Sequence, residues 1–170
     1  MLEYFKGIIL DRYISFRLKL FRDNEDSFNF PQEIRNVRNI LLIIPEDNEY
    51  STSIQSFISE LYKLFDKAEI STFERSTFRK SDGNWFGLPK ESYLKTFQDV
   101  NFDLVIDLNQ PHDNLCTYIC ALIGSPLRMS WTEGQFDHIY NLQIRSKYKG
   151  LIEDKLANIL NYFKSFRKTA

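Results

Sequence analysis

The feature that most constrains the fold is one unit of strand, helix and strand between residues 102 and 131. It opens with FDLVIDL, in which residues 104–106 form an apolar run without strict alternation. Such a run suits a strand that is covered on both faces, as in a parallel sheet. An apolar helix is expected over residues 113–123, and a further strand over 127–131. This β-α-β crossover predicts an α/β fold whose sheet is built outward from it.

Other segments complete the expected sheet. Residues 38–45 read RNILLIIP, and their unbroken apolar run indicates a central strand. AEISTF at 68–73 predicts the next strand, and the alternating YNLQIR at 140–145 predicts an edge strand with one wet face. Apolar positions at helical spacing predict helices over 50–66, 90–98 and 151–166. Together they indicate a three-layer, Rossmann-like α/β fold with a mostly parallel sheet of about five strands.

An additional amphipathic helix is expected at residues 2–22, where apolar side chains recur at helical spacing and the net charge is +3. The expected apolar stripe consists of Leu2, Phe5, Ile9, Tyr13, Phe16 and Leu20. A basic amphipathic helix can bind a membrane surface or a partner. The favoured alternative is that it packs on its own sheet. Polar residues 23–36 are expected to form a linker, so the domain boundaries are 1–36 for helix and linker and 37–170 for one Rossmann-like domain.

The composition narrows the classes of function. A chain of 170 residues that is 43% hydrophobic can bury a substantial core, and its net charge of −1 gives no basis for expecting nucleic acid binding. No segment has the length and apolarity of a membrane span, and no signal peptide pattern opens the chain. The expected location is the cytoplasm, with residues 2–22 offering peripheral contact with the inner membrane face as an alternative.

A long connection at residues 74–89 carries two glycines, Gly83 and Gly87, around Asn84, Trp85 and Phe86. Long loops in compact domains often serve as lids or binding loops. The alternative, which we favour from the sequence, is that the two aromatic side chains fold back and plug the edge of the sheet, because exposed paired aromatics are costly without a partner.

Candidate site residues follow the strands, because ligands of open α/β sheets bind beyond the carboxyl ends of the strands. Asp107, His112 and Asp47 are the candidates for catalysis, since carboxylates and imidazoles serve as general acids and bases. An enzyme would bring Asp107 and His112 into one concave pocket together with Glu46 or Glu49, whereas a binding module would have a shallow rim, with His112 capping its helix. The candidates for ligand binding are Glu46, Asn48, Asn109, Asp113, Trp85 and Trp131.

Several kinds of chemistry are not expected. The expected turns between a strand and the helix that follows it contain no glycine, and Pro45 and Pro111 each remove a backbone donor, so a nucleotide site of the usual kind is not predicted. His112, Cys116 and Cys120 share one helix face, but the first and last of them lie about 12 Å apart along it, too far for one zinc ion. We therefore expect no metal and no cofactor, and interpret the cysteines as small buried hydrophobes.

The segments RNILLIIP, FDLVIDLN, LCTYICALIGSPLRMSW and YNLQI, in this order before a final helix, resemble the N-terminal domain of heptosyltransferase-like glycosyltransferases of family 9. Their two-domain GT-B fold carries the acceptor side in this domain. The chain is also similar to short bacterial proteins of unassigned function, which share a basic N-terminal helix, an Asn-Trp-aromatic-Gly-x-Pro loop (Asn84 to Pro89) and the FDLVIDL strand. The resemblance covers about residues 38–166.

Two departures from the glycosyltransferase pattern shape the functional hypotheses. Glu49 and Tyr50 stand where the family has a Gly-Asp pair with the expected catalytic base, and a second, donor-binding domain is not expected. The leading hypothesis is a non-catalytic binding or interaction module with a protein partner or a second copy. One alternative is an enzyme or enzyme subunit acting on a sugar-like or small polar ligand. Another is an envelope-associated scaffold held by the basic helix.

Overall fold

A computed structural model describes residues 12–14, 16, 29–46, 50–85, 87–134, 136–144 and 151–168. The described strands form one parallel sheet of five strands in the order β2-β1-β3-β4-β5, which confirms the predicted fold class. This is a doubly wound order, and its switch point lies between β1 and β3, the two strands from which the chain proceeds in opposite directions. The strands are β1 (Asn39–Ile44), β2 (Glu69–Glu74), β3 (Leu104–Asp107), β4 (Leu127–Ser130) and β5 (Leu142–Gln143).

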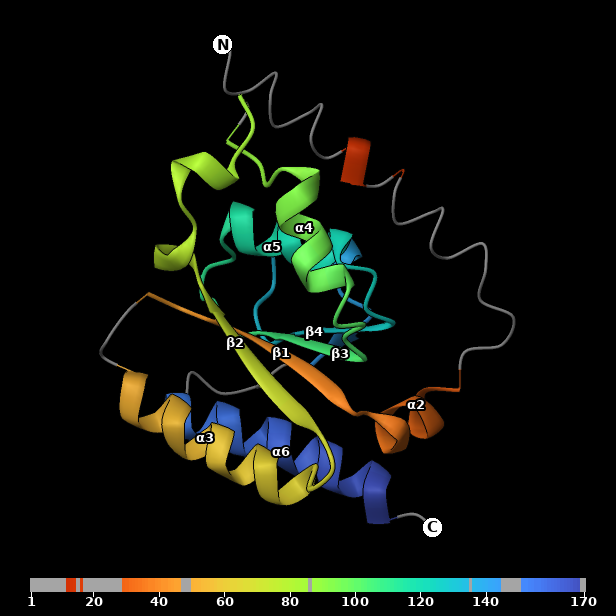
Figure 1. Ribbon diagram of the computed structural model, residues 1–170. Coiled ribbons are helices and arrows are strands. Elements are labelled where there is room, and N and C mark those ends of the chain that lie inside the picture. The colour runs from red at the N-terminus through yellow and green to blue at the C-terminus, as the bar shows by residue number, and fades with distance from the viewer. Residues whose placement is uncertain are drawn as a thin grey trace.

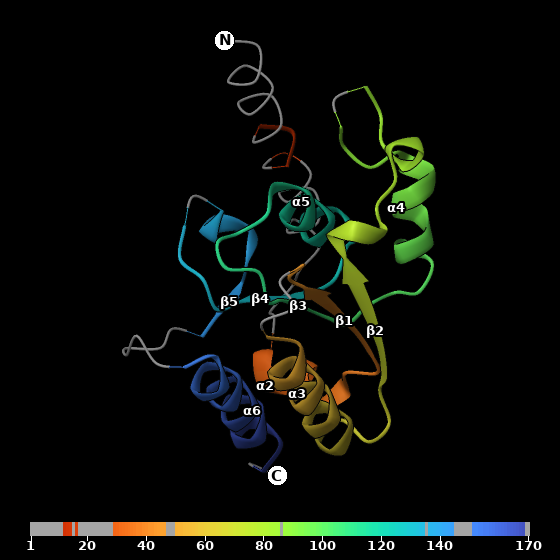
Figure 2. The same ribbon diagram turned by 90° about the vertical axis from the view of Figure 1, so that its left-hand side faces the viewer.

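Helices cover both faces of the sheet, as Figures 1 and 2 show. On one face lie α2 (Phe30–Asn36), α3 (Ser51–Leu64) and α6 (Ile152–Lys168), and on the other lie α4 (Glu91–Gln98) and α5 (Asn114–Leu122). Short 3-10 turns occur at η2 (Arg75–Thr77), η3 (Lys80–Asp82) and η4 (Asp137–Ile139). The fold therefore has three layers, with the sheet in the middle.

The central strands β1 and β3 are buried on both faces. Every residue from Ile40 to Ile43 and from Leu104 to Asp107 is inaccessible to solvent. Ile40 and Leu42 pack into the core beneath α3 and α6, whereas Leu41 and Ile43 pack into the core beneath α4 and α5. Successive side chains of a strand point to opposite faces, so an unbroken apolar run serves two cores at once.

The predicted edge strand at 140–145 is shorter than expected over its described part, residues 140–144, in which only Leu142 and Gln143 pair with β4. Tyr140 is directed into the core instead of alternating at the edge, and is 6% exposed. The amide N–H of Tyr140 donates to the carbonyl of Asp137 at the end of η4, which keeps this part of the chain in a turn.

The end of the expected linker is helical. Asn29 caps α2 by accepting a hydrogen bond from the backbone N–H of Gln32, and Pro31 stands in the first turn, where a missing N–H costs nothing. Ile34 is fully buried beside α6, and the rings of Phe30 and Phe166 meet edge to face at 6.1 Å. The polar character of this stretch concealed a helix that is attached to the domain by Ile34 and Phe30.

Four residues of the N-terminal segment, 12–14 and 16, are described, and the rest of the helix expected at 2–22 lies outside the described residues. Ile14 is buried in the core beneath α4 and α5, as expected of a segment that packs on its own domain. The expected apolar stripe is wrong at this point, because Tyr13 and Phe16 are 42% and 59% exposed. The side chain that packs against the domain is one residue away from the predicted face.

Replacing Ile34 by Ala tests whether α2 belongs to the core. We expect the free energy of unfolding in urea to fall by about 2–5 kcal/mol, because a fully buried aliphatic side chain is lost and leaves a cavity. The matched control is Val100→Ala at a side chain that is 41% exposed, for which the change should stay within about 0.5 kcal/mol. Equal effects of the two substitutions would contradict the packing of α2.

Candidate functional site

A buried carboxylate stands at the carboxyl end of β3. Asp107 is fully buried, and both of its oxygens are hydrogen-bonded. Oδ1 accepts from the backbone N–H and the side-chain amide of Asn109, at 3.0 and 2.8 Å, and Oδ2 accepts from the hydroxyl of Tyr140 at 2.5 Å. Thr117 on α5 is linked to the same tyrosine hydroxyl at 3.2 Å. The carboxylate is thus enclosed by its own domain.

The balance of forces on Asp107 favours its neutral form. Burial raises the pKa of the Asp107 carboxyl, because an ionised group loses the solvation of water, and the hydrogen bonds from Tyr140 and Asn109 oppose this rise without cancelling it. Burial is also the largest cause that raises the pKa of Tyr140, and the neighbouring Asp107 adds to it. A neutral Asp107 would donate to Tyr140, whose hydroxyl could then donate to Thr117.

His112 is held close to this network by an aromatic stack. Its ring lies parallel to that of Tyr140, with centroids 5.0 Å apart and an interplanar angle of 17°, and Nε2 is 2.8 Å from the hydroxyl oxygen of Ser130. A side chain at Gly134 would place a Cβ 3.2 Å from His112 Nδ1, so the glycine permits this close approach. Ser130 pairs with Asp107 across β3 and β4 and is fully buried. The histidine and the aspartate therefore lie near one another, but no bond between them closes a catalytic triad.

The turn after β3 is closed by residues that directly follow β4 and by a residue of α6. The carbonyl oxygen of Asn109 accepts from the indole Nε1 of Trp131 at 3.3 Å and from the hydroxyl of Thr132 at 3.0 Å. Lys155 of α6 lies over the Trp131 ring at 5.6 Å and donates to the side-chain carbonyl of Gln110 at 2.9 Å. Two of the predicted ligand-binding residues, Asn109 and Trp131, thus contact each other.

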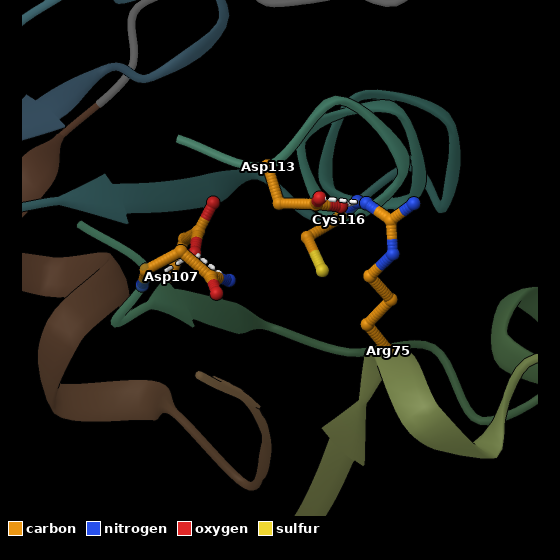
Figure 3. A network of polar contacts seen from close by, with 5 residues as sticks. Arg75, Asp107, Asp113 and Cys116 are labelled. Atoms are coloured by element: carbon orange, nitrogen blue, oxygen red, sulfur yellow. Dashed lines mark hydrogen bonds and ion pairs between the residues drawn. The ribbon is translucent and has the colours of Figure 1, made fainter. Parts of the chain in front are cut away.

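The first turn of α5 is occupied by a carboxylate of the protein. Asp113 is the N-cap, and its Oδ1 accepts from the backbone N–H of Cys116 at 3.0 Å. Figure 3 shows Arg75 reaching from the end of β2 to pair with Oδ2 of Asp113. The cap of α5 is therefore Asp113. Its charge takes the place at the helix N-terminus that a phosphate would need.

The remaining predicted residues lie apart from this network or outside the described residues. Glu46 is exposed after β1, and Asp47 and Asn48 are not among the described residues. Trp85 is 91% exposed, so the interpretation that it plugs the sheet edge is wrong; Phe86 is not described. Both cysteines are buried, as expected, and burial raises the pKa of each thiol, which keeps it uncharged.

Sequence reasoning missed Tyr140, Thr117 and Ser130. A charged residue inside an apolar, doubly covered strand needs a buried partner, so Asp107 itself was the signal that such partners exist. Which residues they are could not be read from spacing, because Tyr140 is 33 positions away in the chain.

The fold and the polar network at the carboxyl ends of β3 and β4 define a doubly wound α/β domain. Its candidate catalytic aspartate, Asp107, is buried in the core. Residues 11–166 match DUF6913, a family of unknown function, and the chain belongs to this family. Neither the curated proteins nor the solved structures contain a match. No helix within the described part of the chain is long and apolar enough to cross a bilayer.

The substitution Asp107→Asn tests the state of the carboxyl group. Asn can keep the hydrogen bonds from Asn109 through its oxygen and donate to Tyr140 through its amide. Because the pKa of Asp107 is raised in the folded state, its carboxyl group makes its full contribution to the free energy of unfolding below the pKa of the unfolded state, about 3.9. This contribution is lost as pH rises through the pKa of the folded state. We therefore expect the variant to gain stability relative to the wild type as pH rises over this window, by up to about 1.4 kcal/mol per pH unit.

The measurement is urea unfolding from pH 4 upward, with Asp99→Asn as the control at an exposed carboxylate, where we expect changes within about 0.5 kcal/mol. A difference between the Asp107 variant and the wild type that falls with rising pH would contradict the direction given for the pKa.

Proposed function

We propose that this chain is a non-catalytic binding module related to the acceptor-side half of a GT-B glycosyltransferase, which holds a partner or a sugar-like ligand at the carboxyl edge of its sheet. The observation that carries the proposal is that two acids at this edge, Asp107 and Asp113, are engaged by other groups of the same domain. Asp107 is fully buried with both oxygens bonded, and Asp113 caps α5 and pairs with Arg75. A general acid or base must reach the proton it transfers, and Asp107 reaches only its own domain.

The glycosyltransferase relationship is supported by where the similar segments lie. RNILLIIP forms β1, FDLVIDLN forms β3 and the start of the following turn, and LCTYICALIGSPLRMSW forms α5 and β4. These are neighbouring elements around the switch point of the sheet. Ligands of doubly wound folds bind in the crevice at this point, so the ligand proposed here would meet Glu46, Gln110 and the half-buried Trp131.

The chemistry of this edge fits a neutral, hydroxylated ligand better than an anionic one. The indole of Trp131 offers an apolar face, and Gln110 offers an amide, whereas Lys155 is engaged with both of them. A phosphate group cannot bind at the N-terminus of α5, because the side chain of Asp113 occupies it. A protein partner or a second copy would use the same exposed groups, in the cytoplasm or at the inner membrane face.

The test is a binding and turnover experiment on the full chain. With Trp85 replaced by Phe, Trp131 becomes the only indole and reports on the edge through its fluorescence. We expect free sugars or oligosaccharides to change this fluorescence, and we expect no transfer or hydrolysis product by mass spectrometry when sugar nucleotides are added. Gln110→Ala should weaken the response about tenfold or less, as one hydrogen bond would, while the exposed control Gln55→Ala on α3 should not. Product formation that depends on His112 would overturn the proposal.

A second candidate is an enzyme subunit whose donor site comes from a partner chain. It is favoured by one observation, the half-exposed His112 with Nε2 at 2.8 Å from Ser130, which orients the ring toward one partner. If this candidate holds, the complex with the partner turns over a sugar nucleotide, and His112→Gln abolishes turnover while leaving complex formation unchanged. If the binding module is correct, the same substitution changes neither.

A further inference from the structure

The loop between β2 and α4 ends in a hairpin that the proposed function does not use. The hairpin, residues 83–89, has an antiparallel bridge between Gly83 and Pro89 and a turn in which the N–H of Gly87 donates to the carbonyl of Asn84 at 2.9 Å. Gly87 has a φ of 76°, a conformation that glycine adopts at little cost. Asn84 also accepts from the N–H of Leu88 through its side chain at 3.2 Å. The backbone of this turn is thus closed by its own hydrogen bonds.

The base of the hairpin packs on the domain. Phe78 and Leu88 pack against the core beneath α4 and α5, and Pro89 is buried. Phe78 also meets the ring of Tyr93 on α4 edge to face at 5.3 Å. Figures 1 and 2 both show the hairpin extending beyond α4 and α5.

Trp85 stands at the tip and is 91% exposed, although other apolar residues of the same loop are packed inward. Tryptophan is enriched at interfaces and at the membrane–water boundary, where its ring has an apolar body and a polar N–H. The loop thus buries Phe78 and Leu88 against the core but leaves Trp85 exposed. This difference indicates that Trp85 serves contact with another surface.

The loop is a basic segment of a chain whose net charge is −1. Residues 75–90 contain Arg75, Arg79, Lys80 and Lys90 against one carboxylate, Asp82, a charge of +3 that leaves −4 on the rest of the chain. Arg75 pairs with Asp113, and the other three cations are exposed beside the hairpin. An exposed indole beside exposed cations is the composition that places a segment at the interface of an anionic bilayer.

We infer that the Trp85 hairpin docks the domain on an anionic membrane surface, with the indole at headgroup depth and Arg79, Lys80 and Lys90 facing the lipid phosphates. A single-stranded nucleic acid fits less well, because such strands stack on successive aromatics along a groove, and the described loop exposes one at its tip. A protein interface would suit Trp85 and Arg79, since Trp and Arg are enriched there, but it accommodates the two lysines less well, because lysine is depleted there.

The test is co-sedimentation of the full chain with vesicles of phosphatidylcholine alone and of phosphatidylcholine mixed with phosphatidylglycerol. We expect binding to the anionic vesicles only, decreasing with salt because the cations are screened. Trp85→Ala should weaken it roughly tenfold or more through the lost apolar area, and each of Arg79→Ser and Lys80→Ser about fivefold. The control Tyr62→Ala, at a side chain that is 49% exposed on α3, should bind like the wild type.

A second measurement reads the tip directly. With Trp131 replaced by Phe, the fluorescence of Trp85 should shift to shorter wavelength on anionic vesicles and become protected from iodide. The inference is overturned if vesicle binding is unchanged by Trp85→Ala and by the two serine substitutions, as it would be if another segment bound the lipid. It is also overturned if the chain binds neither vesicle type, or if single-stranded homopolymer DNA displaces the vesicles and gives the same spectral shift. None of these outcomes depends on the sugar titrations of the carboxyl edge.

Discussion

The carboxyl edge of this domain depends on how a single buried acid is accommodated. Asp107 ends a strand that is covered on both faces, so its carboxyl group cannot reach water. Burial of such a group is tolerated only when each oxygen has a hydrogen-bond partner. Tyr140 supplies one partner and Asn109 supplies the others. The turn after β3 and the turn before β5 are therefore positioned by the same carboxyl group.

The hydrogen bonds around Asp107 determine which other side chains at the carboxyl ends of the strands are engaged within the domain. Tyr140, once directed at Asp107, offers its ring face to His112, and His112 then reaches Ser130 on β4. On the neighbouring helix, Asp113 caps α5 and holds Arg75. Several of the groups that are candidates for acid-base chemistry or anion binding in the sequence, Asp107, Asp113 and His112, thus join β2, β3, β4 and α5. Among the described residues, the exposed Glu46 and Gln110 and the half-buried Trp131 remain for the ligand that we propose.

The extent of prediction from sequence differs between the fold and the site. The parallel sheet followed from the apolar runs of β1 and β3, because burial on both faces leaves a local signature in the chain. Asp107, Asn109, Asp113 and Trp131 were correctly expected at the strand ends, since strand direction alone places them there. Their partners were not foreseen. The helix at 30–36 was missed because one buried Ile among polar residues shows no periodicity. Trp85 was expected to fold inward because it is hydrophobic. Hydrophobicity alone does not reveal that the turn carrying Trp85 directs it outward.

The sequence by itself determined the class of fold, the order of the elements, the buried cysteines and the lack of a glycine-rich phosphate turn. These depend on contacts between neighbours in the chain or on the period of the apolar residues. The tertiary structure decided that Asp107 pairs with a tyrosine 33 residues away, that His112 meets a serine 18 residues away, and that a tryptophan points outward while its loop packs inward. Such pairings depend on which strands become neighbours, and that is settled only when the whole sheet is assembled.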